Sequence, residues 1–289
     1  MMKFALFLGC KIPYYLNHYG AATQAVLKAL KVECIDIEFN CCGYPTRLLD
    51  AEAFLFSAIR NLALAEAKGL DIVTPCKCCF GSFQHARHML SKDSKTRQRL
   101  NAVLAEEGLH WEGTAKVKHL LSVLVHDVGI KTIATKITHR FNAMAIAAHY
   151  GCHALRPSKV TGFDDPLAPR IFEKLIHVTG ARSVVWDKRL ECCGNPLWEK
   201  NSSLSIALMD QKLKDAKQAG ADYLCVACTY CQIQFDTVQH QRLGSNGDRP
   251  VLASILYPQL LGLSLGLEPS VLGLDQNKID ISQIAPNVA

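Results

Sequence analysis

The sequence predicts an α/β protein made of two similar domains from an internal duplication, each with a mainly parallel β-sheet flanked by helices. Apolar, strand-like runs alternate with amphipathic helical stretches, which is typical of βα units. The same succession of elements and cysteine-containing turns occurs twice along the chain. The 289 residues are enough for two domains that each bury an apolar core without cross-links.

Each half opens with an apolar strand that ends in Gly-Cys, KFALFLGC in one half and AMAIAAHYGC in the other. Both halves continue with a helical stretch (AATQAVLKALK; PRIFEKLIHVTG) and a second short strand (VECIDIEF; ARSVVWD). A Cys-Cys-Gly-x-Pro turn follows at 41–45 and again at 192–196. The order of these elements is therefore the same in both halves.

The repeat continues with a long amphipathic helix that ends at Gly69 in the first half and at Gly220 in the second. The strands LDIVTPC and ADYLCVAC then lead into Cys-x-x-Cys pairs, each followed by another helix. The closing segments VKHLLSVLVHDVGI and VLASILYPQLLGLSLGL also correspond, and we expect the second to pack in the core. The polar stretch 135–144 predicts a boundary between a first domain, 1–140, and a second domain, 141–289.

The repeated cysteines all follow predicted strands, where the loops of a parallel sheet converge over one crevice. A Cys-x-x-Cys turn lets two thiolates approach neighbouring metal sites, and a glycine lets an adjacent Cys-Cys pair turn toward the same centre. Structural zinc also binds thiolates but needs only four of them. We therefore predict an iron-sulfur cluster in each half, held by five cysteines: Cys10, Cys41, Cys42, Cys76 and Cys79 in the first, and Cys152, Cys192, Cys193, Cys228 and Cys231 in the second.

Three cysteines have no counterpart in the other half, and we interpret Cys34, Cys78 and Cys225 as small buried apolar residues. Cys78 lies within Cys-Lys-Cys-Cys, so replacement or supplementation of a ligand is the alternative for it. His153 adjoins Cys152 and is predicted to donate a proton to a nascent thiolate. The alternatives are a hydrogen bond to a cluster sulfur or a helix cap.

The other histidines and cations near the motifs are interpreted more simply. We expect structural roles for His85, His88 and His149. The charged residues beside the predicted ligands are expected to be solvated: Arg47, Lys77 and Arg156.

Composition excludes several classes of protein. Thirteen cysteines, an odd number, favour metal or redox chemistry over a disulfide framework. The net charge of +6 is spread along the chain without an aromatic stacking platform, which argues against nucleic acid as a partner. No apolar run approaches membrane-spanning length and the first residues do not resemble an export signal, so we expect a cytoplasmic protein without a transmembrane segment.

With these motifs the sequence resembles the B subunit of heterodisulfide reductase, a family with two cysteine-rich CCG motifs. The similar stretches include IRNLALAEAKGLDIVTPC, GTAKVKHLLSVLVHDVG, HYGCHALRPSKVTGFDDP and KLKDAKQAGADYLCVACTYCQIQFD, and the resemblance covers nearly the whole chain. It implies one noncubane 4Fe-4S cluster per motif. It also implies two partners, a ferredoxin-like C subunit and a flavin-containing A subunit, and a thiol or disulfide as substrate.

One loop departs from the family members that reduce the coenzyme M and coenzyme B heterodisulfide, which carry a glycine-rich run after the second CCG. Here that position holds Asn195, Pro196, Leu197 and Trp198. The resemblance therefore shifts toward the sulfur-oxidising heterodisulfide reductase-like complex, with a lipoate-binding protein as partner. The alternatives are a methanogen's heterodisulfide reductase, an electron-relay or adaptor subunit of a succinate dehydrogenase-like complex, and a purely structural metal module.

Overall fold

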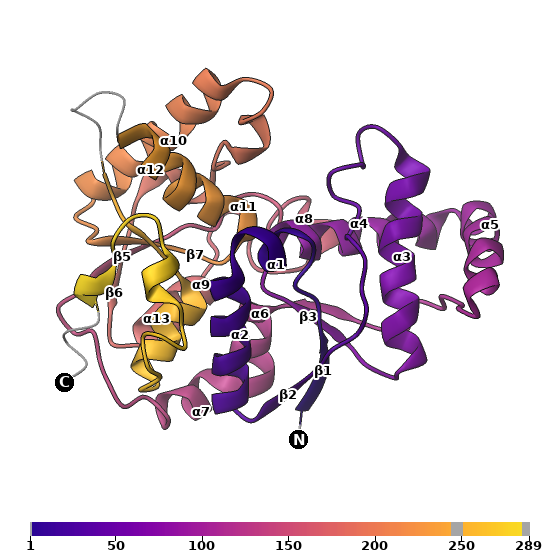
Figure 1. Ribbon diagram of the computed structural model, residues 1–289, viewed down its shortest axis with the longest axis horizontal. Helices are drawn as coiled ribbons and strands as arrows, with labels where there is room; N and C mark the ends of the chain where they lie inside the picture. Colours follow the sequence, from indigo (N-terminus) through magenta and orange to yellow (C-terminus); the bar gives the residue numbers. More distant parts are fainter. Residues whose placement is uncertain (1, 244–250, 285–289) are drawn as a thin grey trace.

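The computed structural model describes residues 2–243 and 251–284, and Figure 1 shows its two halves side by side, indigo to magenta and orange to yellow. Each half contains one four-stranded sheet in which all strands are parallel, in the equivalent orders β2-β1-β3-β4 and β6-β5-β7-β8. The predicted α/β fold with two similar halves is confirmed. The strands are β1 (Met2–Leu6), β2 (Val32–Ile35), β3 (Ile72–Thr74), β4 (Val117–His119), β5 (Ala145–Ala148), β6 (Arg182–Val184), β7 (Tyr223–Val226) and β8 (Ser254–Leu256).

The central strands are short and almost wholly apolar because helices cover both faces of each sheet. Strand β1 pairs with β2 through Ala5 and Ile35, and with β3 through Ala5 and Ile72. Strand β5 is placed in the same way between β6 and β7, and all four of its residues are buried. The strands are shorter than the apolar runs predicted, because each run continues into the loop that carries the cysteines.

The helices follow the order that the repeat predicts. The first half contains α1 (Lys11–Tyr15), α2 (Asn17–Ala29), α3 (Ala51–Ala67), α4 (Lys77–Lys92), α5 (Ser94–Leu104), η1 (Ala105–Glu107), α6 (Leu120–Ser122), the π-helical η2 (Val123–Gly129) and α7 (Ile130–Ala134). The second half contains α8 (Ser158–Thr161), α9 (Ile171–Val178), η3 (Asp187–Leu190), η4 (Asn195–Leu197), α10 (Ser202–Gln218), α11 (Thr229–Gln232), the π-helical η5 (Ile233–Val238), α12 (Gln239–Leu243), α13 (Tyr257–Ser264), η6 (Leu274–Gln276) and η7 (Ser282–Ile284).

The two halves pack against each other through equivalent helices. Helix α2, which follows the first strand of one half, packs against α13, which follows the last strand of the other (Figure 1). Reciprocally, α9 packs against α6, η2 and α7. Every residue of α13 is buried, which confirms the expected core packing of this segment. The shared core brings the carboxyl ends of the two sheets close together.

The described parts of the chain contain no helix that is long and apolar enough to cross a membrane. Residues 135–144 connect α7 to β5, where the sequence places the domain boundary. The limits 1–140 and 141–289 remain a prediction, and residues 285–289 of the second lie outside the described part.

Candidate metal centre

The ten repeated cysteines lie on the loops that leave three neighbouring strands in each sheet. In the first half Cys10 follows β1, the Cys-Cys pair follows β2, and the Cys-x-x-Cys pair follows β3 at the start of α4. In the second half the same three positions follow β5, β6 and β7. Because parallel strands present their carboxyl ends at one edge of the sheet, cysteines far apart in the sequence meet at each edge.

Five thiols of the first half, together with Cys78, surround one cavity. The Sγ atoms of Cys10 and Cys41 lie 3.7 Å apart, and Cys42 shares hydrogen bonds with Cys41 and Cys79. Lys11 and Thr229 also line this cavity, the latter from the other half of the chain. All five predicted cysteines are therefore brought together: Cys10, Cys41, Cys42, Cys76 and Cys79.

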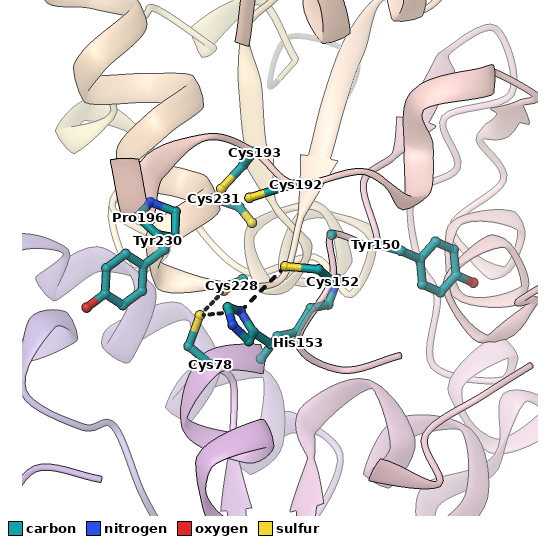
Figure 2. A pocket seen from close by; sticks show the side chains of 12 residues that line it. Cys78, Tyr150, Cys152, His153, Cys192, Cys193, Pro196, Cys228, Tyr230 and Cys231 are labelled. Carbon is teal, nitrogen blue, oxygen red and sulfur yellow. Dashed lines mark hydrogen bonds between the residues drawn. The ribbon is translucent and has the colours of Figure 1, made fainter. Parts of the chain in front are cut away.

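The second half has a matching cavity, shown in Figure 2. The sulfur atoms of Cys192, Cys193 and Cys231 lie beside one another on one side of it, and Cys152 faces them. Lys77 reaches this cavity from the first half. The second set of five is also complete: Cys152, Cys192, Cys193, Cys228 and Cys231.

The two cavities are neighbours and share part of a wall. Cys78 and Tyr230 line both of them. The Sγ atoms of Cys76, Cys78 and Cys228 lie within 4.8 Å of one another, so thiols of the two halves are in contact. Hydrogen bonds between thiols continue from Cys76 to Cys228 and on to Cys231. Two bound metal groups would thus be close neighbours.

The first Cys-Cys-Gly turn is held in place by hydrogen bonds from side chains of helix α3. Asn61 is fully buried, and its amide donates to the carbonyls of Asn40 and Cys41 at 3.3 and 3.1 Å while it accepts from Asn40 N at 2.9 Å. Ser57 donates to the same Cys41 carbonyl at 2.9 Å. Gly43, at φ +78°, completes the turn.

The second Cys-Cys-Gly turn is held by α10 and η5. The amide of Asn195 donates to Gln234 at 3.0 Å, and Gln234 in turn donates to the carbonyl and hydroxyl of Ser205 at 3.2 and 3.1 Å. Gly194 has a φ of +90° and its N–H lies 3.4 Å from Cys192 Sγ. The loop after this turn borders the site, because Pro196 lines the second cavity.

One buried histidine ties the two cysteine loops together. His119 Nδ1 accepts from Leu121 N at 3.2 Å, so its Nε2 carries the proton. That Nε2–H points at the carbonyls of Pro75 and Ala227, 3.0 and 3.2 Å away, which belong to the residues before Cys76 and Cys228. Sequence reasoning missed His119, because it adjoins no cysteine in the sequence and has no counterpart in the second half.

Both halves of the chain match the same family of known proteins. A model of the cysteine-rich CCG domain matches residues 4–84 and again residues 146–236. The B subunit of the ferredoxin/F(420)H(2)-dependent CoB-CoM heterodisulfide reductase from Methanosarcina acetivorans is 34% identical over 96% of this chain and 94% of its own length. The chain belongs to the CCG family of heterodisulfide reductase B subunits.

Two other relatives of this CCG protein are matched over nearly their full length. A protein from Archaeoglobus profundus that is named as similar to the heterodisulfide reductase B subunit is 32% identical over 93% of this chain and 92% of its own. The 8-methylmenaquinol:fumarate reductase membrane anchor subunit of Wolinella succinogenes is 31% identical over 98% of this chain and 99% of its own. The similarity thus extends over nearly the whole chain in relatives that carry different names.

A solved structure shows the same fold. The crystal structure of a hypothetical protein from Helicobacter pylori superposes with a TM-score of 0.79 at 17% identity, over 96% of this chain. This chain spans about half, 52%, of that protein. At this level of identity the likeness establishes the fold alone.

The donor set of this CCG protein fits an iron-sulfur cluster at each cavity. All thirteen cysteines are free thiols, so none of the ten is used up in a disulfide. Hydrogen bonds from Cys41 and Cys79 hold the pKa of Cys42 far below its ordinary value, and those from Cys152 and Cys193 do the same for the pKa of Cys192. Thiolates are the form that binds iron, so the thiols of each site would lose their protons when a cluster binds.

His153 lies at the junction of the two sites, as a residue beside Cys152 should. Its Nδ1 is 3.3 Å from Cys78 Sγ and 3.6 Å from Cys152 Sγ (Figure 2). On the other side its Nε2 is 3.2 Å from the hydroxyl of Tyr44 and 3.4 Å from Arg47. Burial lowers the pKa of His153, which favours the neutral ring.

The three unmatched cysteines have different environments. Cys225 is fully buried in β7, as expected, whereas Cys34 is only partly buried and lines a surface pocket, because β2 is an edge strand. Cys78 is buried as predicted but also faces both cavities. It is therefore more than a small core residue.

The interpretation of Lys77 as a solvated charge is wrong. Its side chain is 2% exposed, because it crosses into the second half and donates to His149 O at 3.0 Å. Arg156 is exposed, as expected. Arg47 is partly buried and lies over the Tyr44 ring, with its guanidinium carbon 4.4 Å from the ring centroid.

Proposed function

We propose that this chain is the iron-sulfur subunit of an oxidoreductase that acts on sulfur groups, with one noncubane 4Fe-4S cluster at each five-cysteine site. The observation that carries the proposal is the pair of adjacent cavities, each lined by its five predicted cysteines and by the shared Cys78. They are joined through Cys76, Cys78 and Cys228. Five thiolates exceed what tetrahedral zinc requires, which favours a larger inorganic core. When bound, the clusters would supply one-electron steps and iron for sulfur to bind.

Aromatic side chains lie where the two cavities adjoin. Tyr44 lines the first cavity and Tyr230 lines both, and their rings lie 5.2 Å apart. Reduction of a disulfide consumes two electrons and two protons and yields two thiols. His153 Nδ1, 3.3 Å from Cys78 Sγ, is placed to pass on one of those protons after the ring, neutral at rest, has taken up a proton.

The altered loop after the second CCG supports a substrate other than the methanogenic heterodisulfide. Pro196 lines the second cavity, and Asn195 is fixed by its hydrogen bond to Gln234. A rigid proline here takes up space that a glycine-rich run would leave open. We therefore favour disulfide, thiol or protein-bound sulfur chemistry in a cytoplasmic sulfur-oxidising complex with a lipoate-binding protein, a ferredoxin-like C subunit and a flavin-containing A subunit.

Electron paramagnetic resonance (EPR) of the anaerobic protein with and without a dithiol tests this function. Reduced lipoamide and a simple monothiol should each be added to the oxidised, iron-loaded chain. A new paramagnetic state that requires the thiol supports sulfur binding at a cluster. Clusters that titrate reversibly with unchanged spectra in both cases would contradict it.

A second candidate function is electron relay in a respiratory complex. It is favoured by the near full-length similarity to the fumarate reductase anchor subunit. An electron relay predicts reversible reduction and no thiol-dependent spectrum, so the same experiment separates the two functions.

Replacement of His153 by glutamine tests its role as proton donor. We expect kcat for disulfide reduction to fall about 100-fold or more, because glutamine keeps a hydrogen-bond donor but cannot give up a proton. Steady-state kinetics with unchanged cluster spectra is the measurement. Tyr44→Phe is the matched control, since it removes only the hydroxyl that lies 3.2 Å from His153 Nε2. It should lower kcat much less than His153→Gln does. Unchanged kcat in His153→Gln would contradict the role as proton donor and leave His153 only a hydrogen-bonding role.

A further inference from the structure

The two cavities occupy equivalent places in the repeat, yet the residues around them differ in polarity. The two sites can be compared through the glycine of each Gly-Cys turn, by asking what a Cβ added there would contact. A Cβ on Gly9 would lie 3.1 Å from Cys79 Sγ and 3.3 Å from the Phe7 ring. A Cβ on Gly151 would lie 3.7 Å from Cys231 Sγ and 3.4 Å from His149 Nε2. His149 therefore takes, at the second site, the place of an apolar ring at the first.

His149 has a feature that a purely structural histidine should lack. It is fully buried, and among the described residues neither ring nitrogen has a hydrogen-bond partner. Its surroundings are otherwise aromatic, with the Phe235 ring 5.0 Å away. A buried imidazole N–H without an acceptor is costly. Because a Cβ on Gly151 would contact both His149 Nε2 and Cys231 Sγ, a sulfur of a group bound beside Cys231 would supply an acceptor.

Lys77 adds a buried positive charge to the second site. It is the second residue of Cys-Lys-Cys-Cys, and the equivalent residue of Cys-Thr-Tyr-Cys is Thr229. Each of the two lines the cavity of the opposite half, so the lysine faces the second site and the threonine faces the first. The Lys77 ammonium lies 4.8 Å from the centroid of the Phe172 ring, away from water.

Lys212 is a second buried positive charge that the first site lacks. It lies on the long helix that follows the second Cys-Cys-Gly turn. It precedes Gly220 by as many positions as Asn61 precedes Gly69. Its ammonium donates to the Lys188 carbonyl and lies 5.1 Å from the Trp186 ring centroid, and its side chain is 1% exposed. At the first site the equivalent residue is thus a neutral amide.

The first site has cations too, but they lie nearer to solvent. Lys11 lines the first cavity and Arg47 lies over Tyr44 at its edge, and both side chains are partly exposed. Water and salt screen such charges far more than buried ones. A buried ammonium and a free N–H stabilise the more negative, reduced state of a nearby cluster and so raise its reduction potential.

We propose that the second site is the electron-accepting member of the pair, its reduction potential set above that of the first by Lys77, Lys212 and His149. With clusters held by the two sets of five cysteines, one electron would pass from the first site to the second. The first cluster would be oxidised by one electron and the second reduced by one, with no bond or proton transferred. This inference rests on the proposed iron-sulfur cofactors but not on the proposed sulfur substrate.

Potentiometric titration followed by EPR tests the order of the potentials. The signals are assigned with Cys42→Ser and Cys193→Ser, each of which should retain the cluster of the other site. In the unaltered chain the second-site signal should titrate at the higher potential. Lys77→Met should lower that potential and leave the first-site potential unchanged. The matched control is Lys174→Met, which removes an exposed lysine from α9 in the second half. It should shift neither reduction potential.

Two further variants keep the proposal testable if Lys77→Met does not load iron. His149→Phe copies the first site and should also lower the second-site potential, whereas Thr229→Lys should raise the first-site potential. Equal potentials, a higher potential at the first site, or no shift in any of the three variants would overturn the proposal. Ordered potentials together with spectra indifferent to thiols would instead refute the sulfur substrate and leave this inference intact.

Discussion

Replacement of Cys42 by serine is expected to abolish metal binding at the first site and spare the second. Cys42 is 3% exposed and touches both Cys41 and Cys79, so its loss removes the thiol at the middle of the five. The iron content of anaerobically prepared protein should fall to about half. Cys193→Ser should have the same effect on the second site, because Cys193 is placed equivalently between Cys192 and Cys231.

Cys34→Ser is the matched control for these variants. Cys34 is a partly buried thiol on the edge strand β2 and lies outside both cavities, so the substitution should leave the iron content and the EPR spectra unchanged. Full iron content in both Cys42→Ser and Cys193→Ser would contradict the assignment of five ligands to each site.

Replacement of Gly194 by alanine is expected to destabilise the second site and the fold around it. At φ +90° an alanine is strained, and its Cβ would lie 2.6 Å from the carbonyl oxygen of Ser205, which belongs to the backbone of α10 and cannot move aside. We expect a loss of about 3 kcal/mol or more in the free energy of unfolding, with reduced iron retention. Gly43→Ala should behave similarly, because its Cβ would lie 2.8 Å from Phe54 O.

The control for steric overlap is Gly69→Ala. Gly69 has a φ of +64° but no atom within 4 Å of a Cβ, so the substitution carries only the conformational cost of about 1 kcal/mol. Thermal unfolding of the iron-loaded proteins compares the three variants. A Gly194→Ala protein as stable as Gly69→Ala would show that the turn after Cys193 is not rigidly held.

The fold was predictable because the same motifs mark the ends of the strands in both halves of the sequence. Gly-Cys after the first strand, Cys-Cys-Gly after the second and Cys-x-x-Cys after the third mark the carboxyl ends of three strands in each half. The strand order was not predictable, since parallel strands that are neighbours in the sheet need not be neighbours in the sequence. Likewise, the packing of α2 against α13 depends on helix faces that meet only in the assembled molecule.

The candidate site was predictable in its ligands and less so in its surroundings. Ten cysteines meet where the repeat places them, because the loops that carry them share one sheet edge. Lys77 was misjudged because burial of a lysine is rare and depends here on a cavity provided by the other half of the chain. His119 was missed because it adjoins no cysteine in the sequence and its two carbonyl partners come from different halves of the chain.

The adjacency of the two sites is the feature with the most bearing on function. The shared wall of Cys78 and Tyr230 and the contact between Cys76 and Cys228 leave little protein between the two cavities. Electron transfer between groups held there would need no further carrier. A sulfur compound bound near His153 would be close to both.

Iron and acid-labile sulfide analysis of anaerobically prepared protein tests the pair of five-thiolate sites most directly. Two 4Fe-4S clusters predict about eight iron atoms and about eight sulfides per chain, with EPR signals that disappear stepwise on oxidation or reduction. Protein that contains zinc and no labile sulfide, or that binds no metal with all ten thiols intact, would contradict the assignment.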